Sequence, residues 1–181
     1  MDSAILQNQD CPGKNEALLD MSASDTEPPV VLQLGGSHPG ELARAVEIAR
    51  PWGYTEVNLN CGCPSPRALG HYLGAALMTD PSLVRACTTA MSEAAGSSTE
   101  VSVKCRLGVH DTVAAMESRG EEYDRLARFV DEVAAGGCVR HFIVHARSAV
   151  LSGLGTTANL SAPPLRHDFV YRLATERPEL K

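Results

Sequence analysis

Short apolar runs alternate along the chain with longer stretches in which apolar residues recur every three or four positions. The short runs resemble buried parallel strands, and we expect strands at 30–34, 55–60, 99–105 and 141–145. The periodic stretches predict helices from Pro39 to before Pro51, from Asp80 to before Gly96, at 121–135 and at 167–175. Because strands alternate with single helices, the sequence predicts an α/β fold with parallel pairing and right-handed crossovers.

Polar residues at the strand ends decide between two α/β architectures. Gln33, Asn60, Lys104 and His145 each lie at or near the carboxyl end of an expected strand. A (β/α) barrel builds its site from several strand ends, whereas a doubly wound sheet gathers ligands at one switch point, often with a G-x-G-x-x-G turn that this sequence lacks. The sequence therefore predicts a partial TIM (β/α) barrel of about four parallel strand–helix units.

Four such units cannot close a barrel of eight strands. We therefore expect missing barrel strands, or another covering of the sheet edges, to lie outside this chain. Residues 1–29 mix polar residues and Pro without an apolar period. They predict a flexible N-terminal lead-in over 1–29, followed by a partial-barrel domain over 30–181.

Composition narrows the class of protein. With 44% hydrophobic and 21% charged residues the chain has ordinary globular composition, and its net charge of -6 means that any RNA contact must be local. No apolar stretch approaches the roughly 20 residues that span a bilayer, so no membrane partner is expected. Six irregularly spaced cysteines and an acidic N-terminal segment favour an intracellular, cytoplasmic protein with reduced thiols, and an organelle stays open.

The string Asn58-Leu59-Asn60-Cys61-Gly62-Cys63-Pro64-Ser65 leaves a strand and enters a loop containing Gly62 and Pro64. Taken alone, a Gly-Cys-Pro is more often a cysteine in a tight turn than a catalytic group. Three further strings follow the same order along the chain: Leu-Gln-Leu-Gly-Gly-Ser at 32–37, Val-Lys-x-Arg-Leu-Gly at 103–108 and His-Ala-Arg at 145–147. Together the four strings resemble the tRNA-dihydrouridine synthases, from about residue 29 to 178.

That resemblance implies FMN-dependent reduction of the C5–C6 double bond of a uridine in tRNA, with NADPH as the reductant. A hydride would reach C6 from the flavin, and a cysteine at the position of Cys63 would deliver a proton to C5. A thiol with a pKa of about 8.5 is mostly protonated at pH 7 and suits that role. We interpret Cys61, where the family has an aliphatic residue, as core packing.

The resemblance also assigns the strand-end residues. Gln33, Lys104 and His145 would bind the flavin, while Asn60 and Arg147 would contact the uridine. Gln33 would otherwise leave an unsatisfied amide at the end of a buried strand, and a flavin edge offers partners for it. Lys104 would stabilise the anionic reduced ring. Outside this constellation, a strand-end Lys or His is more often a satisfied structural residue.

Departures from the family pattern leave a second interpretation open. Ser148 stands where a lysine is usual, Thr157 and Leu160 stand where basic residues are common, and each lost cation weakens phosphate contact. The flavin loop of the first strands, the phosphate-binding final strands and the helical tRNA-binding tail have no counterpart. The alternative is a truncated, inactive remnant that cannot hold FMN. Cys61-x-Cys63 lacks the spacing of a zinc site, so no metal is expected.

Overall fold

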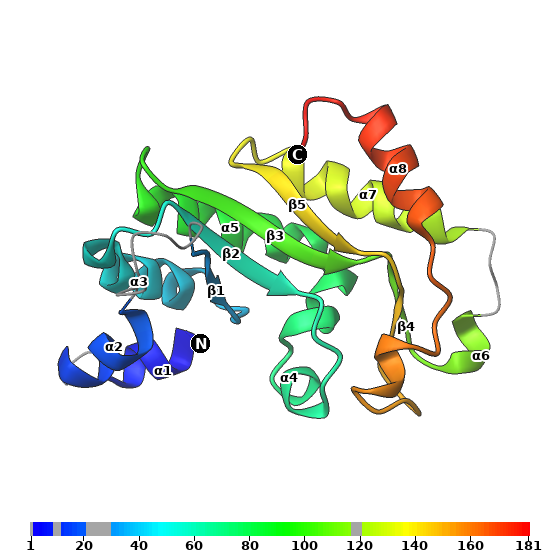
Figure 1. Cartoon of the computed structure of the whole chain (residues 1–181), viewed down its shortest axis with the longest axis horizontal. Coiled ribbons are helices and arrows are strands. Elements are labelled where there is room, and N and C mark those ends of the chain that lie inside the picture. The colour runs from blue at the N-terminus through cyan, green and yellow to red at the C-terminus, as the bar shows by residue number, and fades with distance from the viewer. Residues whose placement is uncertain (1, 9–11, 21–29, 117–120) are drawn as a thin grey trace.

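The computed structural model describes residues 2–8, 12–20, 30–116 and 121–181, which form a four-stranded parallel sheet and a smaller two-stranded one (Figure 1). The larger sheet has the order β1-β2-β3-β5. Its strands are Leu32–Leu34, Glu56–Cys61, Glu100–Arg106 and Val139–His145. The second sheet pairs β4 (Val109–His110) with β6 (Ala149–Val150). The α/β fold and parallel pairing confirm the prediction and are consistent with a partial barrel.

Each strand of the larger sheet is followed by a helix. They are α3 (Pro39–Ala49), α5 (Pro81–Ala95), α7 (Glu122–Ala134) and α8 (His167–Glu176). The start of α5 follows the prediction from Asp80 and Pro81, because the Asp80 carboxylate accepts a hydrogen bond from the Leu83 amide at 3.0 Å. Shorter helical elements lie between these: 3₁₀ turns at Arg50–Trp52, Gly74–Thr79 and Ala158–Leu160, and helices α4 (Pro66–Gly70) and α6 (Val113–Met116).

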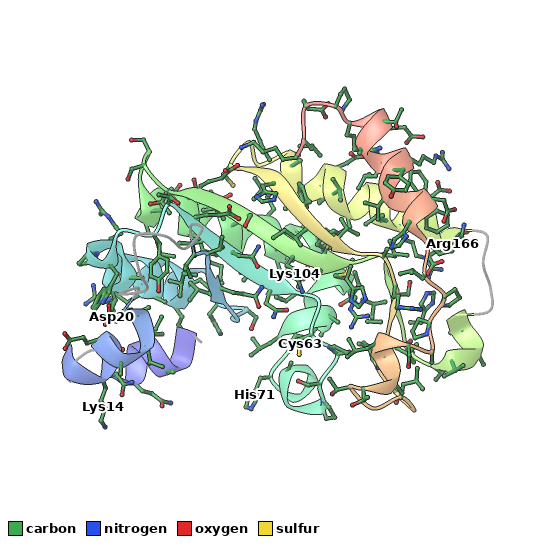
Figure 2. All side chains as sticks on the ribbon, in the orientation of Figure 1. Lys14, Asp20, Cys63, His71, Lys104 and Arg166 are labelled. Atoms are coloured by element: carbon green, nitrogen blue, oxygen red, sulfur yellow. The ribbon has the colours of Figure 1, made fainter. Side chains whose placement is uncertain are left out.

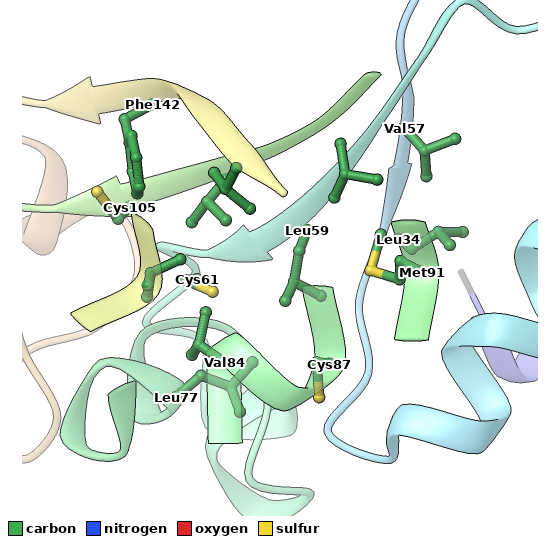
Figure 3. Packing of buried hydrophobic residues seen from close by; sticks show 14 of the residues in the cluster. Leu34, Val57, Leu59, Cys61, Leu77, Val84, Cys87, Met91, Cys105 and Phe142 are labelled. Carbon is green, nitrogen blue, oxygen red and sulfur yellow. The ribbon is translucent and has the colours of Figure 1, made fainter. Parts of the chain in front are cut away.

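Alternation along the strands separates an apolar face from a polar one. Val57, Leu59 and Cys61 of β2 are buried, and Figure 3 shows them beside Cys87 and Met91 of α5. Cys61 is 0% exposed, which confirms its interpretation as a packing residue. Burial, with smaller effects from Cys105 and Cys87, raises the pKa of its thiol well above the usual value.

The N-terminal segment differs from the expected lead-in. Residues 2–7 and 12–19 form helices α1 (Asp2–Gln7) and α2 (Pro12–Leu19), of which α1 lies beside α3 (Figure 1), and both Ile5 and Leu19 are fully buried. The Tyr54 hydroxyl donates to the Leu19 carbonyl oxygen at 2.9 Å, which ties α2 to the turn before β2. The apolar residues of each helix are too few to show a period in the sequence. The polar, Pro-containing stretch at 21–29 lies outside the described residues.

The free edge of β5 meets the end of the described chain. After α8 the backbone turns back, the Lys181 amide donates to the Arg140 carbonyl oxygen at 2.7 Å, and the Phe142 amide donates to the Lys181 carbonyl oxygen at 2.9 Å. These two bonds flank one residue of β5, as in a parallel ladder. Lys181 therefore lies where a further parallel strand would pair.

No helix within the described part of the chain is long and apolar enough to cross a membrane.

Candidate active site

The face of the larger sheet that points away from α5 is lined mainly by polar residues. Strand register places Gln33, Asn58, Ser102 and His141 in one row across all four strands. The next row toward the carboxyl ends contains Asn60 and Lys104, and the row after it contains Arg106 and His145. The strand-end residues predicted from the sequence therefore lie on one face of the sheet, together with the polar row that contains Asn58 and Ser102.

Cys63 lies just beyond the carboxyl end of β2, below the sheet position of Lys104 in the view of Figure 2. The Asn60 side-chain oxygen accepts hydrogen bonds from the amides of Gly62 at 3.0 Å and Cys63 at 3.1 Å. The half-buried Cys63 thiol lies 3.4 Å from the Ser65 hydroxyl. The loop thus fixes the Cys63 backbone while its thiol stays partly accessible.

Gly74 supports the same loop from the other side. Its φ is +62°, and a Cβ added there would lie 2.4 Å from the Cys63 carbonyl oxygen. The next amide, of Ala75, donates to that oxygen at 2.9 Å. Position 74 must therefore be glycine for two reasons, a left-handed backbone and a close approach to Cys63.

Arg106 is a site residue that the sequence reasoning did not select. It is 3% exposed, and its Nε donates to the Gly62 carbonyl oxygen at 3.1 Å while its Nη1 donates to the Asn159 carbonyl oxygen at 3.0 Å. Burial lowers the pKa of Arg106, an effect that Cys63 opposes and Arg147 reinforces. The signal was present in the alternation of β3, because Arg106 follows Lys104 by two positions and must share its face.

His145 and Lys104 provide two different kinds of group at the strand ends. Burial lowers the pKa of His145, and the charges of Arg106, Lys104 and Arg147 lower it further. His145 is therefore a neutral imidazole at pH 7, able both to donate and to accept a hydrogen bond. Lys104 is exposed, and its ammonium has no hydrogen-bond or ion-pair partner among the described residues. It remains available to an anion.

The side-chain amide of Gln33 has hydrogen-bond partners within the protein. The expectation that it would be unsatisfied without a ligand is therefore wrong. Its nitrogen donates to the Asn58 side-chain oxygen at 2.8 Å, and its oxygen accepts from the Asn60 side-chain nitrogen at 2.9 Å. The neighbouring strand β2 supplies both partners, which the position of Gln33 in its own strand does not reveal. One N–H and one oxygen lone pair of Gln33 remain for a ligand.

Arg147 and Ser148, which follow β5, both form hydrogen bonds within the protein. The Arg147 Nη1 donates to the carbonyl oxygens of Ser161 and Pro163, so this guanidinium holds the loop that follows β6. Ser148 is 1% exposed and its hydroxyl donates to the Glu122 carboxylate. The position where the family has lysine thus points into the protein here, while Thr157 and Leu160 are exposed.

Glu56, Glu100 and His141 form a group whose ligand atoms lie within 4.8 Å of one another, as cation ligands do. The sequence predicts no metal site, and no motif in it indicates this cluster. His141 Nδ1 lies 3.2 Å from the Glu56 carboxylate, and the Lys181 ammonium lies 3.2 Å from that of Glu100. Each carboxylate already faces a basic group of the protein, and the cluster lies at the opposite end of the strands from Cys63.

Comparison with known proteins gives a consistent result. The family model described as dihydrouridine synthase (Dus) matches residues 4–175. The chain is 50% identical over 168 residues to the tRNA-dihydrouridine(20/20a) synthase of Xylella fastidiosa (strain 9a5c), covering 93% of this chain and 46% of that protein. It is 43% identical over 168 residues to the protein of the same name from Synechocystis sp., with 93% and 46% covered.

A partial-barrel α/β fold with its polar groups at the strand ends is the class that the structure defines. Within that class, the chain belongs to the dihydrouridine synthase family, because the family match covers nearly all of it. The match begins inside α1, so the N-terminal helices are part of the family region. The chain spans about half the length of the curated relatives it matches.

Proposed function

We propose that this chain carries the proton-donating part of a flavin-dependent tRNA-dihydrouridine synthase. The observation that carries the proposal is Cys63, a half-buried thiol at the strand ends, in a loop whose amides donate to the Asn60 oxygen and whose Gly62 carbonyl oxygen accepts from Arg106. The reaction is reduction of the C5–C6 double bond of a uridine in tRNA. A hydride adds to C6 and the Cys63 thiol gives its proton to C5, so the base gains two hydrogen atoms in total.

FMN, when bound, supplies the hydride, and NADPH restores the reduced flavin. The polar face supports such a ligand: Lys104 offers a free ammonium, neutral His145 offers a donor and an acceptor, and Gln33 keeps one of each. The Lys104 charge would favour the anionic form of a reduced flavin ring. These three residues would hold the flavin ring.

Recognition of tRNA is the next part of the proposal. The chain has a net charge of -6, yet Lys104, Arg106 and Arg147 lie close enough to His145 to lower its pKa. This local cationic cluster supports contact with an RNA substrate. A uridine would have to leave its stack to reach Cys63, and in this proposal Asn60 and Arg147 would contact the flipped nucleotide. The cysteines in the described part of the chain are free thiols, which supports a reducing, intracellular location.

A replacement experiment tests the proposal. Residues 30–181 of this chain would replace the matching segment of the Xylella fastidiosa relative, which is 50% identical to it. We expect this chimaera to bind FMN and to form dihydrouridine in tRNA when NADPH is supplied. A chimaera that binds FMN with the relative's affinity but forms no product would contradict the proposed function.

The alternative is an inactive remnant of the family that cannot hold FMN. Its support is that the chain spans about half the length of the relatives it matches. We expect the 181-residue chain alone to bind FMN far more weakly than the chimaera and to leave tRNA unmodified. Stoichiometric, tight FMN together with dihydrouridine product from the chain alone would show that the chain lacks nothing essential.

A further inference from the structure

We propose that Glu56, at the opposite end of the sheet from Cys63, is a positioning residue that sets the direction of a hydrogen-bond chain holding the Cys63 loop. We call this chain the polar ladder; its members are Glu56, Ser102, Asn58, Gln33 and Asn60. Its effect on proton donation rests on the proposed function, whereas its effect on the loop does not.

The polar ladder is continuous from the amino end of β2 to the loop. The Ser102 hydroxyl donates to the Glu56 carboxylate at 2.5 Å, and the Asn58 nitrogen donates to the Ser102 oxygen at 2.8 Å. The Gln33 nitrogen donates to the Asn58 oxygen at 2.8 Å, and the Asn60 nitrogen donates to the Gln33 oxygen at 2.9 Å. The Asn60 oxygen then accepts the amides of Gly62 and Cys63.

A carboxylate gives this sequence of bonds one direction. An ionised Glu56 carboxylate can only accept hydrogen bonds. The Ser102 hydroxyl must therefore donate its single hydrogen to Glu56 and accept a hydrogen bond from Asn58. Asn58 then turns its oxygen toward Gln33, whose own oxygen must face Asn60. As a result Asn60 presents its oxygen, and not its nitrogen, to the two loop amides, which need an acceptor.

Burial prevents water from replacing the central members. Asn58 is 1% exposed and Ser102 is 0% exposed, so a broken link there leaves a buried polar group unpaired. His141 Nδ1 lies 3.2 Å from the Glu56 carboxylate and provides a further partner at that end. The amide orientations are mutually consistent from the carboxylate to the loop.

Glu100 offers a matched control. It is the register partner of Glu56 on β3, and its carboxylate pairs with Lys181, outside the polar ladder. Glu56→Gln keeps the size of the side chain but adds a donor, so the ladder can run in either direction. The reversed direction leaves the Gly62 and Cys63 amides without an acceptor. Glu100→Gln removes the same charge at the same level and leaves the ladder intact.

The test is residue-resolved hydrogen exchange of the 181-residue chain, free of flavin and tRNA. We expect the amides of Gly62 and Cys63 to exchange about threefold to tenfold faster in Ser102→Ala, from the loss of one buried hydrogen bond. Glu56→Gln should change them in the same direction. Ser102→Thr, which keeps the hydroxyl, and Glu100→Gln should match the unmodified chain.

Unchanged exchange of both amides in folded Ser102→Ala or in folded Glu56→Gln would overturn the proposal. If Ser102→Ala does not fold, Glu56→Gln against Glu100→Gln decides alone: equal exchange in these two variants also overturns it. Because no cofactor or substrate is present, the result is independent of the proposed function. A chimaera without activity, combined with the expected exchange pattern, would contradict the proposed enzymatic function but support the role of the polar ladder.

Discussion

Gly74 approaches Cys63 so closely that a Cβ on Gly74 would lie 2.4 Å from the Cys63 carbonyl oxygen and 2.9 Å from the Cys63 Cβ. The contact joins the turn before α5 to the loop after β2. It makes the position of the thiol depend on a residue eleven positions further along the chain.

Gly74→Ala should therefore displace the Cys63 loop and destabilise the protein. The left-handed backbone and the clash together should cost about 1–3 kcal/mol in the free energy of unfolding, measured by urea denaturation. Gly53→Ala is the matched control, because Gly53 has a φ of +76° but nothing within 4 Å of an added Cβ. Equal Cys63 alkylation rates in the two variants would show that the close approach does not position the loop.

The cysteines should differ in their reaction with iodoacetamide as pH rises. Burial raises the pKa of Cys87 to about 11 and that of Cys105 to about 12, so both thiols stay protonated and unreactive through pH 9. Cys63 is half-buried and should be alkylated before Cys87 and Cys105. Peptide mass spectrometry after a short pulse at pH 8 measures the order, and modification of Cys105 before Cys63 would contradict the assigned burial.

Lys104→Met should weaken FMN binding in the chimaera. The change removes an exposed ammonium that has no partner in the described part of the chain. Loss of one charge-assisted contact should raise the Kd for FMN about tenfold, measured by fluorescence titration. Lys181→Met is the control, because Lys181 pairs with Glu100 at the other end of the sheet. An unchanged Kd in Lys104→Met would remove Lys104 from the flavin site.

The sequence supported the repeated strand–helix units because their apolar periods are long and their ends carry clear signals, such as Asp80 before α5. It did not reveal α1 and α2, whose few apolar residues show no period although Ile5 and Leu19 are buried. The strand ends pointed to Cys63 and Lys104 by motif. Arg106 was missed because its role depends on the Gly62 and Asn159 carbonyl oxygens, which come from separate loops.

Dependence on a partner from another segment also explains why the sequence wrongly predicts an unsatisfied amide at Gln33. From the sequence it is one polar residue in an apolar run, and its need for a partner is evident. Which partner satisfies it depends on the row that places Gln33 beside Asn58, and thus on parallel register across β1 and β2. Local pattern predicts elements and faces, whereas hydrogen-bond partners between strands require the register.

The measurement that bears most directly on the central claim is dihydrouridine formation by the chimaera with Cys63→Ala and with Cys61→Ala. Cys63→Ala should abolish product while FMN stays bound, because it removes the proposed proton donor without touching Gln33, Lys104 or His145. Cys61 packs against α5, so Cys61→Ala should reduce stability and leave activity nearly unchanged. Full activity in Cys63→Ala, or loss of activity in a folded, FMN-bound Cys61→Ala, would contradict the account.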